Sequence, residues 1–419
     1  MSILYLAIFL FVSFCFYNDF KRTLILYAPF KLVLHTGILL VDSSTSIILD
    51  LPISSVALFL FFFNTQKRTV LKSHLPNVLL WGWSVYLLSM LLYSFNPKFK
   101  ITILLNPLIM YFAYSYMLFI IIRTKKQMEL LFKGFIAVSL VLFADAFIDV
   151  LTGHNLIIAI EESQAGTHFW HSDNAVVRAG LSRTTSFMPH SLTMGCLAAL
   201  LWGVLYLIGF RSKIKINTSI TLFTMFGLIF CILFSNSRSS IIAFVALLPV
   251  LFDYKSLSFN KIFLIAASFV IVFFFFGDYI LWIFNSIFNE DKVDVMGSTT
   301  DLRRRQFDIA SYYMMKHPFL GNGQTFNVMN HVSENVILGM ESVWFPIMMQ
   351  QGLVGVAGYI TLIVTTAIYF FRSKQHLYLF FVVSWVATIT MSSQVGLSIF
   401  LFVLVPLLAC KMKKQNLLK

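Results

Sequence analysis

An all-α protein that crosses a membrane many times is the fold class that this sequence predicts. Of its 419 residues, 58% are hydrophobic and 12% are charged, whereas soluble proteins are about 45–50% apolar and about 25% charged. Apolar runs of about 20 residues, the length that spans a bilayer, alternate with short connections rich in Lys and Arg. The whole chain, 1–419, is therefore predicted to form one integral-membrane domain.

The apolar runs predict about thirteen spans. The weakest is 23–41, because it contains Pro29, Lys31 and His35, and a count of twelve with this segment shallow or re-entrant stays open. The first run lacks a basic start and a small-residue cleavage site, so we interpret it as a retained span. The predicted spans are 2–18, 23–41, 46–63, 78–95, 101–122, 128–151, 191–210, 217–235, 239–252, 259–285, 343–371, 377–393 and 396–410.

The basic connections predict the sidedness of the spans from residue 64 onward. Clusters of Lys and Arg recur at every second connection, which marks those connections as cytoplasmic. The connections between them then face outside: a first large loop at 152–190, a tight corner at 235–238 and a second large loop at 286–342. The net charge of +13 is explained by this topology, and nucleic acid is not expected as a partner. The sidedness of the N-terminus stays open.

The second large loop contains a predicted surface helix over about 301–316. Thr299, Thr300 or Asp301 can cap its start, and His317-Pro318 ends it. The glycines that follow, Gly321 and Gly323, permit backbone turns that other residues resist. We expect this helix to lie across the outer membrane face.

Arginines in the outward-facing segments are candidates for a functional site, because the positive-inside rule disfavours basic residues there. Guanidinium groups bind phosphate oxygens in a bidentate manner and do not lose their charge. Several of them from separate loops would suit a diphosphate at the membrane surface. Pairing with nearby carboxylates or with lipid phosphates is the alternative. These arginines are Arg178, Arg183, Arg238, Arg303, Arg304 and Arg305.

The aspartates, histidines and cysteines of the chain are weaker candidates for a site. Asp145 and Asp149 are four residues apart near the outer end of a predicted span and share a helix face, where they could be functional or pair with an arginine of the bundle. The histidines of the outer loops lack the spacing of a zinc site, and the four cysteines lie in or beside apolar segments. We expect no metal and no cofactor.

The chain resembles the superfamily of O-antigen ligases and O-antigen or exopolysaccharide polymerases. The resemblance covers about 183–360, and the N-terminal half is similar only in its hydropathy pattern. Four motifs in this order carry it: Arg183-Thr-Thr-Ser-Phe-Met-Pro189, Ser235-Asn-Ser-Arg238-Ser, Arg303 and Phe307 followed by His317-Pro-Phe-Leu-Gly321-Asn-Gly323, and Gly352-Leu-Val-Gly355.

One difference from the ligase motif bears on whether the chain is a ligase or a polymerase. In the ligases a His-Asn pair stands eleven residues before the first of the late glycines, and here that pair is Glu341-Ser342. The absence of the histidine favours a polymerase. A carboxylate at this place could accept a proton from an acceptor hydroxyl, or it could simply be a polar residue at the membrane interface.

The resemblance implies a metal-independent membrane glycosyltransferase of the C-type fold, with its site on the outer face of the bacterial cytoplasmic membrane. It would join repeat units carried on undecaprenyl diphosphate into O-antigen, capsule or exopolysaccharide, with a chain-length regulator as a possible partner. Arg183 and Arg303 would stabilise the diphosphate and Glu341 would act as base. The binding candidates are Arg178, Arg238, Arg304, Arg305, His317, Gly321 and Gly323. A ligase, or a flippase for lipid-linked oligosaccharides, is the alternative.

Overall fold

A computed structural model gives the architecture of the chain. It describes residues 3–34, 49–64, 75–93, 102–153, 184–186, 188, 191–251, 300–323, 342–391 and 396–417. Every element within these ranges is helical. Predicted segments that fall elsewhere, including the span 259–285 and most of both large outer loops, lie outside the described residues.

The helices stand where the apolar runs predict them, with ends that differ by a few residues. The weak second segment is helical as α2 up to Leu34, and the rest of the predicted segment, 35–41, lies outside the described residues. In chain order the elements are α1 (Ile3–Asn18), α2 (Phe20–Leu34), α3 (Asp50–Asn64), α5 (Asn77–Tyr93), α6 (Thr102–Leu105), η1 (Asn106–Ala113), α7 (Tyr114–Ile121), α8 (Lys125–Thr152), α10 (Ser191–Val204), η2 (Leu205–Phe210), α11 (Thr218–Phe234), α12 (Arg238–Val245), η3 (Leu248–Leu251), α14 (Thr300–Lys316), α16 (Trp344–Arg372), α17 (Leu377–Met391) and α18 (Gly396–Lys414).

Three of the described helices are long and apolar enough to cross a membrane: Lys125–Thr152, Ser191–Phe210 and Trp344–Arg372. Most of the other apolar helices in the described part have 10–17 residues, which is shorter than the bilayer core requires for an untilted helix. The structure therefore supports an all-helical membrane protein, while the number of spans, twelve or thirteen, and the C-type fold stay predictions.

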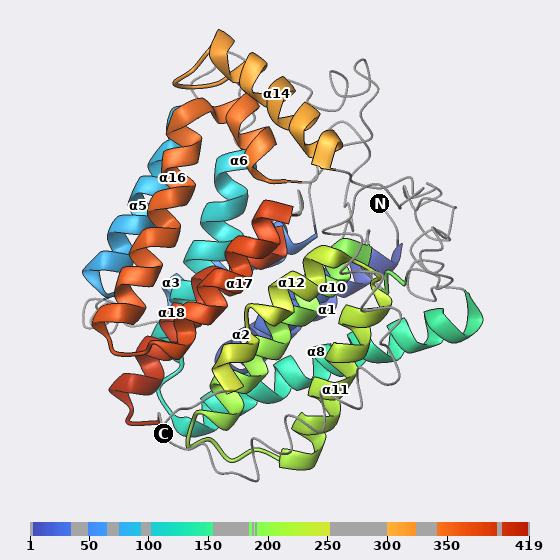
Figure 1. Ribbon diagram of the computed structural model, residues 1–419. Coiled ribbons are helices and arrows are strands. Elements are labelled where there is room, and N and C mark those ends of the chain that lie inside the picture. Colours follow the sequence, from blue (N-terminus) through green and yellow to red (C-terminus); the bar gives the residue numbers. More distant parts are fainter. Residues whose placement is uncertain are drawn as a thin grey trace.

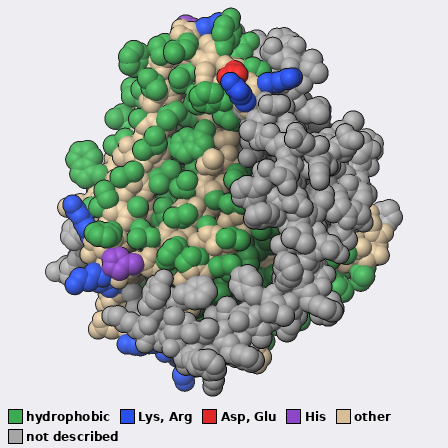
Figure 2. All heavy atoms as spheres, in the orientation of Figure 1, with side chains coloured by type: hydrophobic (Ala, Val, Ile, Leu, Met, Phe, Trp, Pro, Cys, Tyr) green, Lys and Arg blue, Asp and Glu red, His purple; other side chains and the backbone are tan. Residues whose placement is uncertain are grey.

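The bundle is built around α10, which is buried along almost its whole length. It packs against α11, α12, α17 and α18, and α8 lies beside α11 and α2. On another side α5 runs along α16, and α14 lies across the end of α16 (Figure 1). Hydrophobic side chains cover most of the described part of the face seen in Figure 2, with Lys and Arg mainly at its edges. This distribution is the one expected of a surface that contacts lipid.

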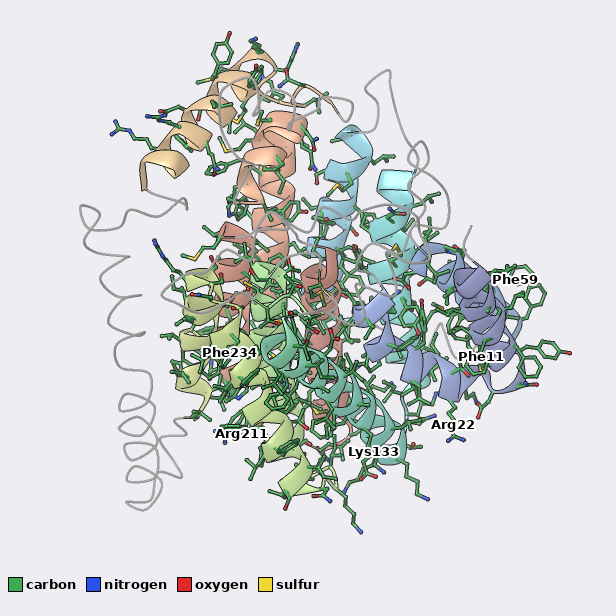
Figure 3. All side chains as sticks on the ribbon, turned by 90° about the vertical axis from the view of Figure 1, so that its right-hand side faces the viewer. Phe11, Arg22, Phe59, Lys133, Arg211 and Phe234 are labelled. Atoms are coloured by element: carbon green, nitrogen blue, oxygen red, sulfur yellow. The ribbon has the colours of Figure 1, made fainter. Side chains whose placement is uncertain are left out.

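The end of the bundle opposite α14 carries basic side chains. Arg22, Lys133 and Arg211 all lie in the lower half of Figure 3, whereas α14 is at the top. By contrast, Phe11 and Phe59 point outward from α1 and α3 at the side of the bundle. These cations and α14 therefore lie at opposite ends of the bundle, and which end faces the cytoplasm stays a prediction.

A buried ion pair joins α2 to α3 and explains how the second predicted span accommodates the charge of Lys31. Lys31 Nζ lies 2.9 Å from Asp50 Oδ2, and the two side chains are only 2% and 1% exposed. Tyr27 Oη donates to Asp50 Oδ1 at 2.7 Å, and Lys31 Nζ donates to Ser54 Oγ at 2.7 Å. The Lys31 ammonium also lies 4.2 Å from the centroid of the Tyr114 ring on α7. Because a charge in an apolar bundle requires such partners, α2 and α3 can be buried only together.

Candidate functional site

The corner between α11 and α12 carries Arg238, the first residue of α12. Asn236 has a positive φ of 49°, which allows the chain to reverse over very few residues. The hydroxyls of Ser235 and Ser240 are 3.2 Å apart and lie against Gly195 of α10, where a Cβ atom would overlap both oxygens. The corner is therefore seated tightly on the central helix, and Arg238 starts from a fixed backbone.

The segment that follows Arg183 in the chain is fixed beside this corner. The backbone N–H of Thr184 donates to the carbonyl of Phe234, the last residue of α11, at 3.2 Å. The N–H of Thr185 donates to Asp149 Oδ2 at 3.1 Å. Two carboxylates of α8 hold the segment, since Asp145 accepts from the side-chain hydroxyl of Ser186.

Ser186 is fixed by a hydrogen bond of its side chain and has a left-handed backbone conformation. Its hydroxyl donates to Asp145 Oδ2 at 2.9 Å, and its φ is 49°. A left-handed conformation is costly for a residue other than glycine, so it persists only where the surroundings fix it. Asp145 and Asp149, which the sequence left open between a functional role and pairing with an arginine, thus bind the residues directly after Arg183.

The C-terminal end of α17 connects the same corner to the beginning of α16. The N–H of Val343 donates to the carbonyl of Ile389 at 3.0 Å, and Trp344 Nε1 donates to Thr390 Oγ1 at 3.1 Å. One residue further along α17, the carbonyl of Met391 accepts from Ser239 Oγ at 3.5 Å. The segment that follows Glu341 is therefore bound to Ile389 and Thr390 of α17. The next residue of α17, Met391, contacts the corner.

α14 lies against α16, with its buried side formed by Gln306 and Ala310. The rings of Phe307 and Phe345 have centroids 6.4 Å apart, which places this part of α14 beside the first turn of α16. Arg304 and Arg305 are exposed in the first half of α14. In Figure 1, α14 extends from α16 toward the side on which α10 and α12 begin. The two arginines lie within one turn of Phe307 on α14, and therefore near the start of α16.

The turn after α14 closes a break in α16. The helix is interrupted at Gly352, with φ 62° and ψ −154°, so backbone groups on both sides of the break lose their intrahelical partners. The turn supplies new ones, as Asn322 N to Met349 O at 2.9 Å, Gly323 N to Gln350 O at 3.0 Å, Leu353 N to Pro318 O at 2.8 Å and Val354 N to Phe319 O at 3.1 Å. Buried backbone groups are satisfied in this way across two segments far apart in sequence.

The glycines of both motifs are explained by this junction. Gly321 has φ 66°, and a Cβ atom on it would collide with the backbone of Gln350; a Cβ on Gly352 would collide with the carbonyl of Pro318. Gly355 makes room for the folded-back side chain of Gln351. The positive φ angles of Gly321 (66°) and Gly323 (83°) agree with the predicted turn, whereas the close approach of Gly321 to Gln350 was not predicted. The role of both glycines in substrate binding stays a prediction.

Of the residues predicted to form the site, the structure describes Arg238, Arg304, Arg305, His317, Gly321 and Gly323. Arg303 lies in the first turn of α14, and its side chain is outside the described part. Arg178, Arg183 and Glu341 lie outside the described residues. His317 is exposed at the end of α14, where its carbonyl accepts from Gly321 N at 2.9 Å. Within the described ranges there is no group of three His, Cys, Asp or Glu side chains that could hold a metal ion.

Residues 220–360 match the family model described as O-antigen ligase. This region is a domain of the O-antigen ligase and polymerase superfamily. The domain contains the corner, α14, its turn and the break at Gly352, while the first motif, which begins at Arg183, lies before it. No curated protein matches the chain. Members of the family are glycosyltransferase-like enzymes acting on lipid-linked glycans, and the matched domain indicates a function of this type in glycan assembly.

Proposed function

We propose that the protein polymerises oligosaccharide repeat units carried on undecaprenyl diphosphate, at the outer face of the bacterial cytoplasmic membrane. The products would be O-antigen, capsule or exopolysaccharide chains. The O-antigen ligase domain at 220–360 supports the general class of reaction, transfer of a lipid-linked glycan. The branch and the roles of individual residues rest on the arguments below.

The observation that carries the proposal is the convergence of three segments at one end of the bundle. Thr184 is bound to the end of α11, Ser239 to Met391, and Val343 to Ile389. Arg183 immediately precedes the first of these residues, Arg238 the second, and Glu341 comes two residues before the third. The described neighbours of Arg183 and Glu341 in the chain thus meet beside the corner that carries Arg238, which supports the proposal that these three residues form one site.

The reaction that this arrangement suits is a substitution at the anomeric carbon of the donor sugar. A hydroxyl of the acceptor unit attacks that carbon, and the bond to the diphosphate oxygen breaks. The hydroxyl proton passes to the carboxylate of Glu341, and undecaprenyl diphosphate leaves with the bonding electrons. Arg183 and Arg303 stabilise the negative charge on the diphosphate, with Arg178, Arg238, Arg304 and Arg305 supporting. Donors fixed in advance where charge develops are among the strongest sources of catalysis.

The residue at position 341 favours a polymerase over a ligase in this proposal, because the ligase motif has a histidine there and this chain has Glu341. A flippase is the other alternative. Transporters place polar groups at helix breaks near the bilayer midplane, whereas the break at Gly352 lies near one end of α16 and its polar backbone is closed by the turn. The described break is therefore closed by backbone hydrogen bonds and differs from the open helix breaks of transporters.

Deletion of the gene provides the cellular test. We expect the surface glycan to collapse from a ladder of lengths to a single repeat unit, because units are still made and exported but are not joined. Electrophoresis of surface glycan before and after complementation measures this. Polymer that is still made on the undecaprenyl carrier but is not attached would identify a ligase. Repeat units that remain on the cytoplasmic side would identify a flippase, and either result would overturn the proposal.

A further inference from the structure

A cluster of exposed apolar side chains lies at the end of α14 and in the turn that follows. Tyr312 is 60% exposed, Met315 73%, Phe319 70% and Leu320 46%. We call these four residues the rim patch. Exposed apolar groups gathered in this way mark a surface that is covered by a partner or by lipid.

The rim patch cannot turn inward, because the other side of α14 is locked to α16. Asn322 Nδ2 donates to the carbonyls of Tyr313 and Met349, both at 2.8 Å. Gln306 and Ala310 are fully buried on the inner side. The exposure of the patch is therefore a fixed property of this junction, and whatever covers it comes from outside the described part of the chain.

The length of α16 indicates the level at which the patch lies. The uninterrupted part of the helix, from Leu353 to Arg372, is about 30 Å long at about 1.5 Å per residue. The hydrocarbon core of a bilayer is also about 30 Å thick. The turn is bonded to Leu353 and Val354 through the carbonyls of Pro318 and Phe319. With Arg372 at the opposite face of the core, the turn would stand where the hydrocarbon core ends and the headgroup layer begins.

The patch also continues a surface that faces lipid. Along α16 the exposed apolar residues recur at helical spacing and form one stripe down the helix: Leu353, Ile360, Val364, Ile368 and Phe371. The stripe starts at Leu353, next to the turn that holds Phe319 and Leu320. In Figure 2 hydrophobic side chains cover this face as far as the end that carries α14. Lipid that covers the stripe would reach the patch without interruption.

The polar groups around the patch suit the headgroup layer. Lys316 Nζ lies 4.5 Å from the ring centroid of Tyr312 and 4.9 Å from that of Tyr313. Aromatic rings beside basic groups are typical of the membrane interface, where the rings enter the acyl boundary and the cations reach lipid phosphates. Lys316 itself is exposed at the C-terminal end of α14, beside the patch.

We propose that the rim patch is a membrane anchor: it inserts into the interfacial layer of the leaflet at this end of α16 and binds phospholipid there. The C-terminal half of α14 would then rest on lipid at the edge of the protein, while its N-terminal half extends over the bundle. This anchor is independent of the glycan reaction and would be present in an inactive variant.

Site-directed spin labels test the anchor in the full chain reconstituted into phospholipid vesicles. Cysteines replace Met315 and Phe319 in turn, with Asp308→Cys as an exposed control on the same helix and Val364→Cys as a membrane-embedded control. Cys15 is half-buried and the other three native cysteines are buried, so the parent chain treated with label gives the background. Collision with oxygen, which concentrates in lipid, is compared with collision with a water-soluble nickel complex.

We expect oxygen to dominate most strongly at 364, to dominate less at 315 and 319, and the nickel complex to dominate at 308. Equal nickel access at 315, 319 and 308 would show a water-facing patch and overturn the proposal. Protection of 315 and 319 from both reagents would also overturn it, because the patch would then be covered by protein. Should that protection disappear on dilution into excess lipid, the partner would be a second copy of this chain.

Discussion

Replacing Arg183 or Arg303 with Lys is expected to reduce polymerisation on the order of 100- to 1000-fold. Lysine keeps the positive charge but loses the planar fork that binds two phosphate oxygens at once. Losing one such preorganised donor typically costs about 2.7–4 kcal/mol of transition-state stabilisation. The rate of polymer formation in membrane vesicles that contain equal amounts of each variant measures the effect.

Arg211→Lys and Arg372→Lys are the matched controls. Arg211 follows η2 and Arg372 ends α16, at the ends of these helices predicted to be cytoplasmic. The same change in shape there should leave activity near that of the wild type. If properly inserted Arg183→Lys and Arg303→Lys proteins both polymerise at the wild-type rate, neither arginine binds the diphosphate as proposed.

Breaking the Lys31–Asp50 pair is expected to destabilise the protein by about 3–5 kcal/mol, because either single change leaves a buried charge without its partner. In Lys31→Met the carboxylate of Asp50 keeps only hydroxyl donors such as Tyr27, at 2.7 Å, and Ser54, at 3.0 Å. In Asp50→Leu the ammonium of Lys31 loses its counter-ion. Thermal unfolding in detergent, followed by the fraction that stays monodisperse, gives the midpoint for each variant.

The double variant Lys31→Met, Asp50→Leu separates the charge from the packing. Well-packed apolar residues can replace a buried pair at little cost, so the double variant should unfold at a higher temperature than either single variant. A double variant that unfolds at the temperature expected from adding the two single effects would show that the two residues do not act as a pair. Val364→Ala, an exposed residue on α16, controls for a change in side-chain volume alone.

Sequence reasoning succeeded where the physical signal is local. Apolar runs of the right length predicted where the described helices lie, and Lys31 marked the weakest of them. A capping residue near Thr300 and the pair His317-Pro318 predicted a helix over about 301–316, and the structure has α14 at Thr300–Lys316. Caps, prolines and hydropathy act over one or two turns of helix, so they can be read from one stretch of chain.

Contacts between segments far apart in sequence could not be predicted in this way. Asp50 as the partner of Lys31, Asp149 as the acceptor for Thr185, and the turn that closes the break at Gly352 all depend on how helices pack. Sequence reasoning recognised the two glycine-containing motifs separately. It did not predict that they pack against each other at one junction, which is why both motifs require glycine. Arg178, Arg183 and Glu341 lie outside the described residues, so their roles still rest on the sequence and on their neighbours in the chain.

The most direct measurement of the central claim is polymerisation by the purified protein. The chain is reconstituted into vesicles with an undecaprenyl-diphosphate-linked repeat unit as the sole substrate, and product length and free undecaprenyl diphosphate are followed together by mass spectrometry. The account predicts lipid-linked products of two or more units, with one undecaprenyl diphosphate released for each new linkage. Substrate that stays unchanged until a different acceptor is added, and is then transferred to that acceptor as single units, would contradict it.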